Sequence, residues 1–173
     1  MMKKRVLFLL FSLIIADLQS QTTRQDLRNA FLRAIDKRES LDSLKLILEN
    51  KNNRTFLEDS YPGICYALYA NYAEGNFAKL KYVWKAHKLL NKSVSEKPND
   101  PEPRFFRFML EHHLPSFLGL NKDIPHDLNI IFTNQHFLDD NVAMKKKAIE
   151  FLLWTNRCSQ NQAALLKAQL SKL

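Results

Sequence analysis

One group of side chains in the sequence could hold a metal ion or carry out hydrolysis. Glu111, His112 and His113 are consecutive, and His126 and Asp127 follow further along the chain. Imidazole and carboxylate groups are common zinc ligands. Adjacent histidines point about 100° apart on a helix, so His112 and His113 cannot easily bind one ion. We therefore expect no metal and no cofactor, and we keep a metal-dependent or hydrolytic enzyme that uses His112, His113 or His126 as an alternative.

Arg104, Arg107 and Glu111 share one face of a predicted helix whose other positions are mostly apolar. Two arginines on one face could bind a carboxylate or phosphate group, which makes Arg104 and Arg107 candidate binding residues. In the alternative, structural interpretation, Arg107 pairs with Glu111 and Arg104 reaches a carboxylate of a neighbouring helix. The apolar surroundings favour the structural interpretation. His87 falls in the apolar stripe of another predicted helix, where a buried, hydrogen-bonded histidine is the expected outcome.

Four tyrosines surround a single predicted helix and cannot all face one core. They are Tyr61, Tyr66, Tyr69 and Tyr72. We expect one or more of Tyr66, Tyr69 and Tyr72 to line a binding groove. The alternative is that their hydroxyl groups lie at the margin of the core, which is common for tyrosine.

The chain has two cysteines, Cys65 and Cys158. In an oxidising compartment they could form a disulfide. They could instead be small buried hydrophobic residues, because free cysteine is often interior. The sequence leaves both alternatives open.

The elements that must position these residues are predicted to be helices throughout. The chain has only 3 glycines and no alternating runs of β-branched residues bounded by turns, which argues against a sheet. Apolar residues recur at helical spacing instead. The predicted helices span residues 23–38, 41–48 with Ser40 as N-cap, 62–74 with Pro62 in the first turn, 77–95, 101–114, 125–133, 139–156, and a last one after Ser159. We predict an all-α fold of about eight helices in antiparallel hairpins.

Residues 1–20 are typical of a secretory signal peptide. Lys3, Lys4 and Arg5 precede an apolar run, and a small residue, Ser20, precedes the predicted cleavage site before Gln21. We expect residues 21–173 to form one exported domain, periplasmic or secreted. No later apolar run reaches the roughly 20 residues of a transmembrane helix, so none is predicted after cleavage.

The charge of the chain is basic but dispersed. The formal net charge is +8, and the leader contributes three basic and one acidic residue, so the mature chain carries 8 − 2, or +6. Basic and acidic residues are interleaved, whereas nucleic-acid binding favours a basic stripe with aromatic partners. We therefore expect no nucleic-acid partner.

Residues 86–103 carry a resemblance to a known repeat family. Ala86, Leu90 and Ser93 have a small, large, small spacing, and Pro98 follows with Asn99 and Asp100 next. This stretch resembles the junction between two tetratricopeptide repeats, which implies stacked helical hairpins with a concave surface for a peptide or protein. The stretch over residues 101–120 is also similar to small exported bacterial helical proteins. That similarity does not point to any particular activity.

These observations together predict an exported helical module that binds a protein or peptide of the cell envelope and has no catalytic activity. Catalysis would require several polar groups that converge in one pocket, whereas a binding module needs an exposed groove. The enzyme that uses the histidines is one alternative. A purely structural component of the envelope is another.

Overall fold

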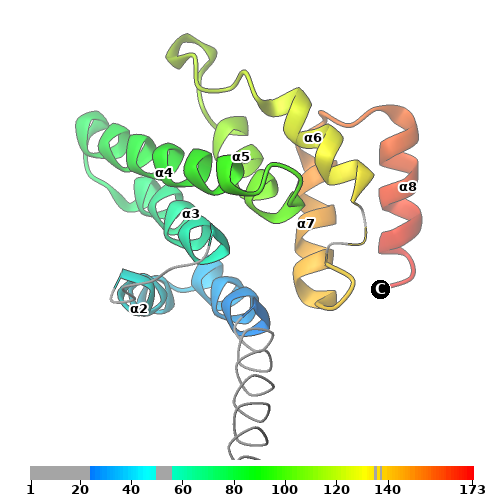
Figure 1. Ribbon diagram of the computed structural model, residues 1–173, viewed down its shortest axis with the longest axis horizontal. Coiled ribbons are helices and arrows are strands. Elements are labelled where there is room, and N and C mark those ends of the chain that lie inside the picture. Colours follow the sequence, from blue (N-terminus) through cyan, green and yellow to red (C-terminus); the bar gives the residue numbers. More distant parts are fainter. Residues whose placement is uncertain (1–23, 50–55, 135, 137) are drawn as a thin grey trace, which may run out of the picture.

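The computed structural model describes residues 24–49, 56–134, 136 and 138–173, and Figure 1 shows that they are predominantly helical. The described residues form eight α-helices and one 3-10 turn, with no strand among them, which confirms the all-α prediction. The elements are a helix over residues 24–36, α2 (Arg38–Glu49), α3 (Phe56–Tyr72), α4 (Asn76–Glu96), α5 (Pro101–His112), η1 (Ser116–Leu118), α6 (Ile124–Thr133), α7 (Val142–Trp154) and α8 (Gln160–Leu170). The predicted leader lies outside the described residues.

Consecutive helices pack against one another along most of the chain. Contacts join α2 to α3, α3 to α4, α4 to α5, α5 to α6, and α7 to α8, and α3 also contacts α5. In Figure 1, α2 and α8 lie at opposite sides of the molecule with α5 between them. Among the described helices, none combines the length and the hydrophobicity needed to cross a bilayer.

The helices α3 and α4 approach closely because one position of α3 has no side chain. A Cβ atom at Gly63 would lie 2.8 Å from Cγ of Leu90 on α4, which is closer than van der Waals contact allows. Ala86 and Ser93, the small residues on either side of Leu90 along α4, are also fully buried. The glycine at position 63 therefore lets Leu90 pack directly on the backbone of α3.

The helix α5 forms the centre of the core. Phe105, Phe106 and Phe108 are almost fully buried, and the Phe106 ring lies 5.1 Å from Phe31 and 5.0 Å from Tyr61, centroid to centroid. Burying each such side chain contributes about 1.5–3 kcal/mol. The helix is therefore anchored on most of its sides, and any polar residue it carries must find its partners inside the protein.

Local signals fix some helix ends and fail at others. The last helix follows Ser159 as predicted, and a capping box holds its start: Ser159 Oγ accepts a hydrogen bond from the Gln162 backbone, and the Gln162 side chain accepts one from the Ser159 backbone. The predicted start of α3 is wrong, because α3 begins at Phe56 and Pro62 lies inside it. The predicted cap at Ser40 is also wrong, because α2 begins at Arg38 and the Lys37 backbone still bonds to the preceding helix. Packing against neighbouring helices overrides these local preferences.

Candidate functional site

The two buried arginines of α5 converge on one carboxylate of α6. Asp127 Oδ1 accepts hydrogen bonds from Arg104 Nη1 and Arg107 Nη2, each at 2.6 Å, and Asp127 Oδ2 accepts one from Arg107 Nε at 2.8 Å. All three side chains are buried. Arg107 also donates to Asn91 Oδ1 at 2.8 Å. The arrangement supports the structural interpretation of the arginines, with one correction: the principal partner of Arg107 is Asp127, whereas Glu111 lies 3.9 Å away.

Glu111 is a buried carboxylate whose two oxygens have no hydrogen-bond donor among the described residues. Its nearest basic neighbours are His87 Nε2 at 3.4 Å and Arg107 Nε at 3.9 Å. Burial raises the pKa of Glu111, and the negative charges of Asp127 and Asp123 add to this, while His87 and Arg107 oppose it. His87 itself is half-buried at the edge of the core, and its ring lies 3.1 Å from Asn91 Nδ2. The ionised form of Glu111 is therefore an unfavourable feature of the folded state.

This burial leads to a prediction about pH. Because the pKa of Glu111 is higher in the folded than in the unfolded state, wild type gains stability as the pH falls through that raised pKa, and it loses this gain as the pH rises. Glu111→Gln keeps the shape but carries no charge. We expect it to raise the free energy of unfolding at pH 8 by about 1 kcal/mol and to lose this advantage near pH 4, measured by urea denaturation.

A matched control separates the effect of Glu111 from that of its neighbour. His87 Nε2 lies 3.4 Å from Glu111, so the same comparison is made in the His87→Gln background. In each background we compare the free energy of unfolding of the Glu111→Gln variant with that of its parent. The prediction would be contradicted if this difference did not change with pH in either background.

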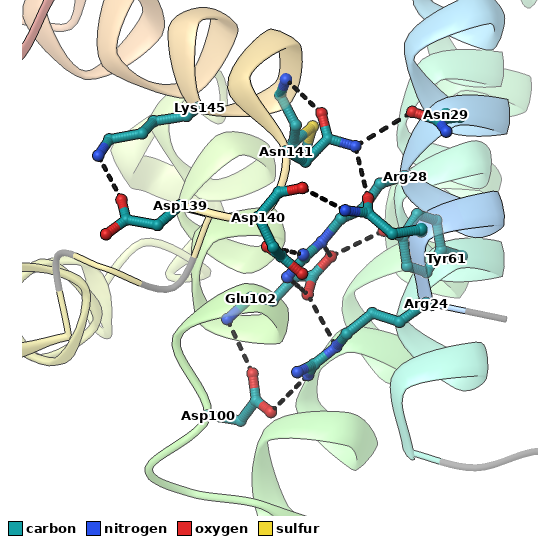
Figure 2. Close-up of polar contacts among 12 residues, drawn as sticks. Arg24, Arg28, Asn29, Tyr61, Asp100, Glu102, Asp139, Asp140, Asn141 and Lys145 are labelled. Atoms are coloured by element: carbon teal, nitrogen blue, oxygen red, sulfur yellow. Dashed lines mark hydrogen bonds and ion pairs between the residues drawn. The ribbon is translucent and has the colours of Figure 1, made fainter. Parts of the chain in front are cut away.

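A second buried network joins the helix over residues 24–36 to the core, as Figure 2 shows. Arg28 donates to both carboxylate oxygens of Glu102, at 3.1 and 2.8 Å, and to Asp140 Oδ1 at 2.6 Å. Tyr61 donates to Glu102 at 2.7 Å, and burial raises the pKa of Tyr61. Arg24 lies 3.4 Å from the same carboxylate. Neither Arg28 nor Glu102 stands out in the sequence, because 74 residues separate them.

The histidines predicted as a possible metal or hydrolytic site do not come together in the structure. His112 and His113 contact aromatic rings instead. The rings of His112 and His113 lie 5.2 Å apart at 84° to one another, and His113 stacks on Trp154 at 5.7 Å. Arg157 Nε donates to His112 Nδ1 at 2.9 Å, and burial lowers the pKa of His112, with smaller effects of His113 and Arg157. His126 is exposed on α6. In the part of the chain that the structure describes, no three His, Cys, Asp or Glu side chains are grouped so that they could hold a metal ion.

The tyrosines of α3 divide between the core and the surface. Tyr66 and Tyr69 are buried, and their hydroxyl groups donate to Glu49 and Asp42 at the margin. Both hydroxyls therefore follow the core-margin alternative, and burial raises the pKa of both tyrosines. Tyr72 is exposed. A binding role for Tyr72 stays a prediction.

The two cysteines are free thiols in the structure. Cys65 is buried in α3, whose helical neighbours among the described residues are α2, α4 and α5. Cys158 lies between α7 and α8, where its thiol donates to the Leu152 carbonyl at 3.5 Å. Burial raises the pKa of Cys65 to about 12 and also raises that of Cys158. Both thiols stay protonated at neutral pH, as small hydrophobic residues do.

A hollow of about 320 Å³ lies between the helix over residues 24–36 and α2, and we call it the hairpin hollow. Its lining is Ala30, Arg33, Glu39, Ser40, Ser43, Leu44 and Ile47. Ile47 and its neighbour Leu46 are 62% and 63% exposed. The residues that the sequence suggested for binding are not among those that line the hollow. They are Tyr66, Tyr69, Tyr72, Arg104 and Arg107. A second cavity, between α6, α7 and α8, measures only about 30 Å³ and is apolar.

The chain matches no family model, no curated protein and no solved structure. The tetratricopeptide resemblance of residues 86–103 therefore stays a prediction. The fold defines the protein as an all-helical chain of consecutively packed helices, and its function has to be inferred from its surfaces and its interior.

Proposed function

We propose that the protein is an exported helical module that binds a protein or peptide partner of the cell envelope through the hairpin hollow. The observation that carries the proposal is the hollow itself, with its exposed apolar rim at Leu46 and Ile47. Its volume falls in the range of ligand sites, about 300–1,000 Å³. Two exposed aliphatic side chains beside a concavity are typical of surfaces that accept an apolar anchor from a partner.

The lining of the hollow suits a short protein segment. Ala30, Leu44 and Ile47 offer apolar contacts, while Arg33 and Glu39 offer charges of both signs for orienting polar groups. Amphipathic segments that dock between helices use this combination of an apolar anchor and peripheral polar contacts. The tetratricopeptide resemblance supports the same kind of partner, and the predicted leader supports its location in the envelope.

The alternatives have less support in the described residues. Two of the buried carboxylates bind buried arginines, as Asp127 binds Arg107 and Glu102 binds Arg28. A catalytic site needs such groups to converge on an open pocket. The histidine enzyme is retained as an outcome of the test below, and a structural component of the envelope stays the other alternative.

The test is capture of a partner by hollow variants. The mature protein is cross-linked in envelope extract, the partner is identified by mass spectrometry, and its affinity for the purified protein is measured. We expect Ile47→Asp to weaken this affinity at least tenfold, because a charge in the apolar anchor site must be desolvated on binding.

Leu165→Asp provides the matched control. Leu165 is an exposed aliphatic residue of α8, away from the hollow, so its change to aspartate should leave the affinity unaltered. Equal affinities for Ile47→Asp and wild type would contradict the proposal. A hydrolytic activity of the purified protein that disappears in His112→Ala would support the enzyme instead.

A further inference from the structure

The outward side of α4 combines aromatic and basic residues, and we call it the α4 face. It consists of Phe77, Lys81, Trp84 and Lys88, all exposed. Their spacing of four, three and four residues places them on one side of the helix, over about 16 Å of its length. The opposite side, with Leu90 and its neighbours, is buried against α3 and α5. The α4 face is therefore the solvent-facing side of a rigidly held helix.

The charge of this helix is strongly one-sided. Before its last residue, Glu96, α4 contains five lysines and no acidic residue. Lys85 and Lys92 are partly neutralised by Glu49 and Asp59. Lys81 and Lys88 form no ion pair with any described residue. A positive field of this kind attracts an anionic partner.

The shape of the α4 face indicates what kind of anionic partner fits. The face is the convex ridge of a helix, and the two hollows described above are lined by other elements. A peptide needs a groove or a strand edge, whereas a convex ridge can meet an extended surface. Phe77 is 86% exposed and Trp84 is 49% exposed. Aromatic rings between lysines are typical of helices that lie on a bilayer, with the rings at the acyl boundary and the ammonium groups at the headgroups.

We infer that the α4 face docks on the surface of an anionic phospholipid bilayer. The lysines attract the phosphate-bearing headgroups, and Phe77 and Trp84 bury their rings at the interface. The docking leaves the hairpin hollow free, because the hollow belongs to the helix over 24–36 and α2, and α3 packs between α2 and α4 (Figure 1). The inference goes beyond the proposed partner binding and does not depend on it.

The two tryptophans of the chain allow each face to be observed separately. Trp154→Phe leaves Trp84 as the single tryptophan, and Trp84→Phe leaves Trp154, which lies on α7. Vesicles of phosphatidylcholine with and without phosphatidylglycerol are the probe. We expect phosphatidylglycerol vesicles to shift the emission of Trp84 to shorter wavelength and to leave that of Trp154 unchanged. No shift for Trp84 would overturn the inference.

Charge variants test the role of the lysines. Each lysine near an anionic bilayer contributes about a fivefold change in partition. Lys81→Gln with Lys88→Gln should therefore lower vesicle partition about 25-fold, whereas Lys146→Gln with Lys147→Gln, an equal change of charge on α7, should have little effect. Ile47→Asp should bind vesicles as wild type does, which separates this result from that of the hollow.

Three outcomes would count against bilayer docking. They are an equal loss in the α7 control, equal partition into vesicles without phosphatidylglycerol, and binding of poly-glutamate through the α4 face without binding of vesicles. The last of these would assign the face to an acidic protein.

Discussion

Replacing Asp127 by alanine is expected to destabilise the protein by about 3–5 kcal/mol, because it leaves two buried guanidinium groups without their shared counter-ion. Arg104 and Arg107 both donate to this carboxylate, and both are buried. Neither arginine can lose its proton to escape the cost of desolvation. The free energy of unfolding, measured by urea denaturation, gives the result directly.

Two further variants show that the buried charge is responsible. Asp127→Asn keeps the size and one acceptor oxygen, so its loss should be intermediate. Asp123→Ala removes a partly exposed carboxylate 3.7 Å from Arg107 and should cost less than about 1 kcal/mol. A loss in Asp127→Ala no greater than that in Asp123→Ala would show that water or other groups solvate the arginines.

The helical architecture could be predicted because it depends on local patterns. The apolar spacing in residues 77–95 and the Ser159 and Gln162 capping signal are properties of neighbouring residues, and both correspond to observed helices. The predicted starts of α2 and α3 are wrong because tertiary contacts override local preference there. Pro62 normally begins a helix, yet it lies within α3, which is packed against both α2 and α4.

The partners of the buried charges could be predicted only in part. An arginine on an apolar helix face must find a carboxylate, so the need for a partner of Arg104 was evident from the sequence. Which carboxylate it finds depends on how α6 returns to α5 after the turn between them. Glu111 was the obvious partner of Arg107 at a spacing of four residues, yet Asp127 provides the shorter contacts. Sequence spacing identifies partners within a helix and not those between helices.

Both surfaces that carry our proposals also escape simple sequence patterns. Leu46 and Ile47 are aliphatic residues of a type usually found in the core. Their exposure follows from how α2 packs on α3. Trp84 sits beside the apolar stripe of its helix in the sequence, and the fold places it on the outward side. Arg104 and Arg107 bind Asp127, and Arg28 binds Glu102, so these buried charges are occupied within the protein and we expect functional contacts at exposed side chains.

The pair of Arg28 and Glu102 should show the largest energetic coupling in the protein. Arg28 donates two hydrogen bonds to Glu102, and Tyr61 donates a third to the same carboxylate. Arg28→Met leaves the carboxylate buried with the tyrosine and a partly exposed arginine, Arg24. Glu102→Leu leaves a buried guanidinium with an exposed carboxylate, Asp140. We expect each single change to cost about 3–5 kcal/mol in the free energy of unfolding.

The double variant distinguishes the cost of unpaired charges from the value of the pair. Combining Arg28→Met with Glu102→Leu removes both charges, so it should cost at least about 2 kcal/mol less than the sum of the single changes. Asp140 offers the matched control, because it contacts Arg28 from an exposed position and Asp140→Ala should cost less than about 1 kcal/mol. Additive losses in the double variant would mean that Arg28 and Glu102 stabilise the protein independently of each other.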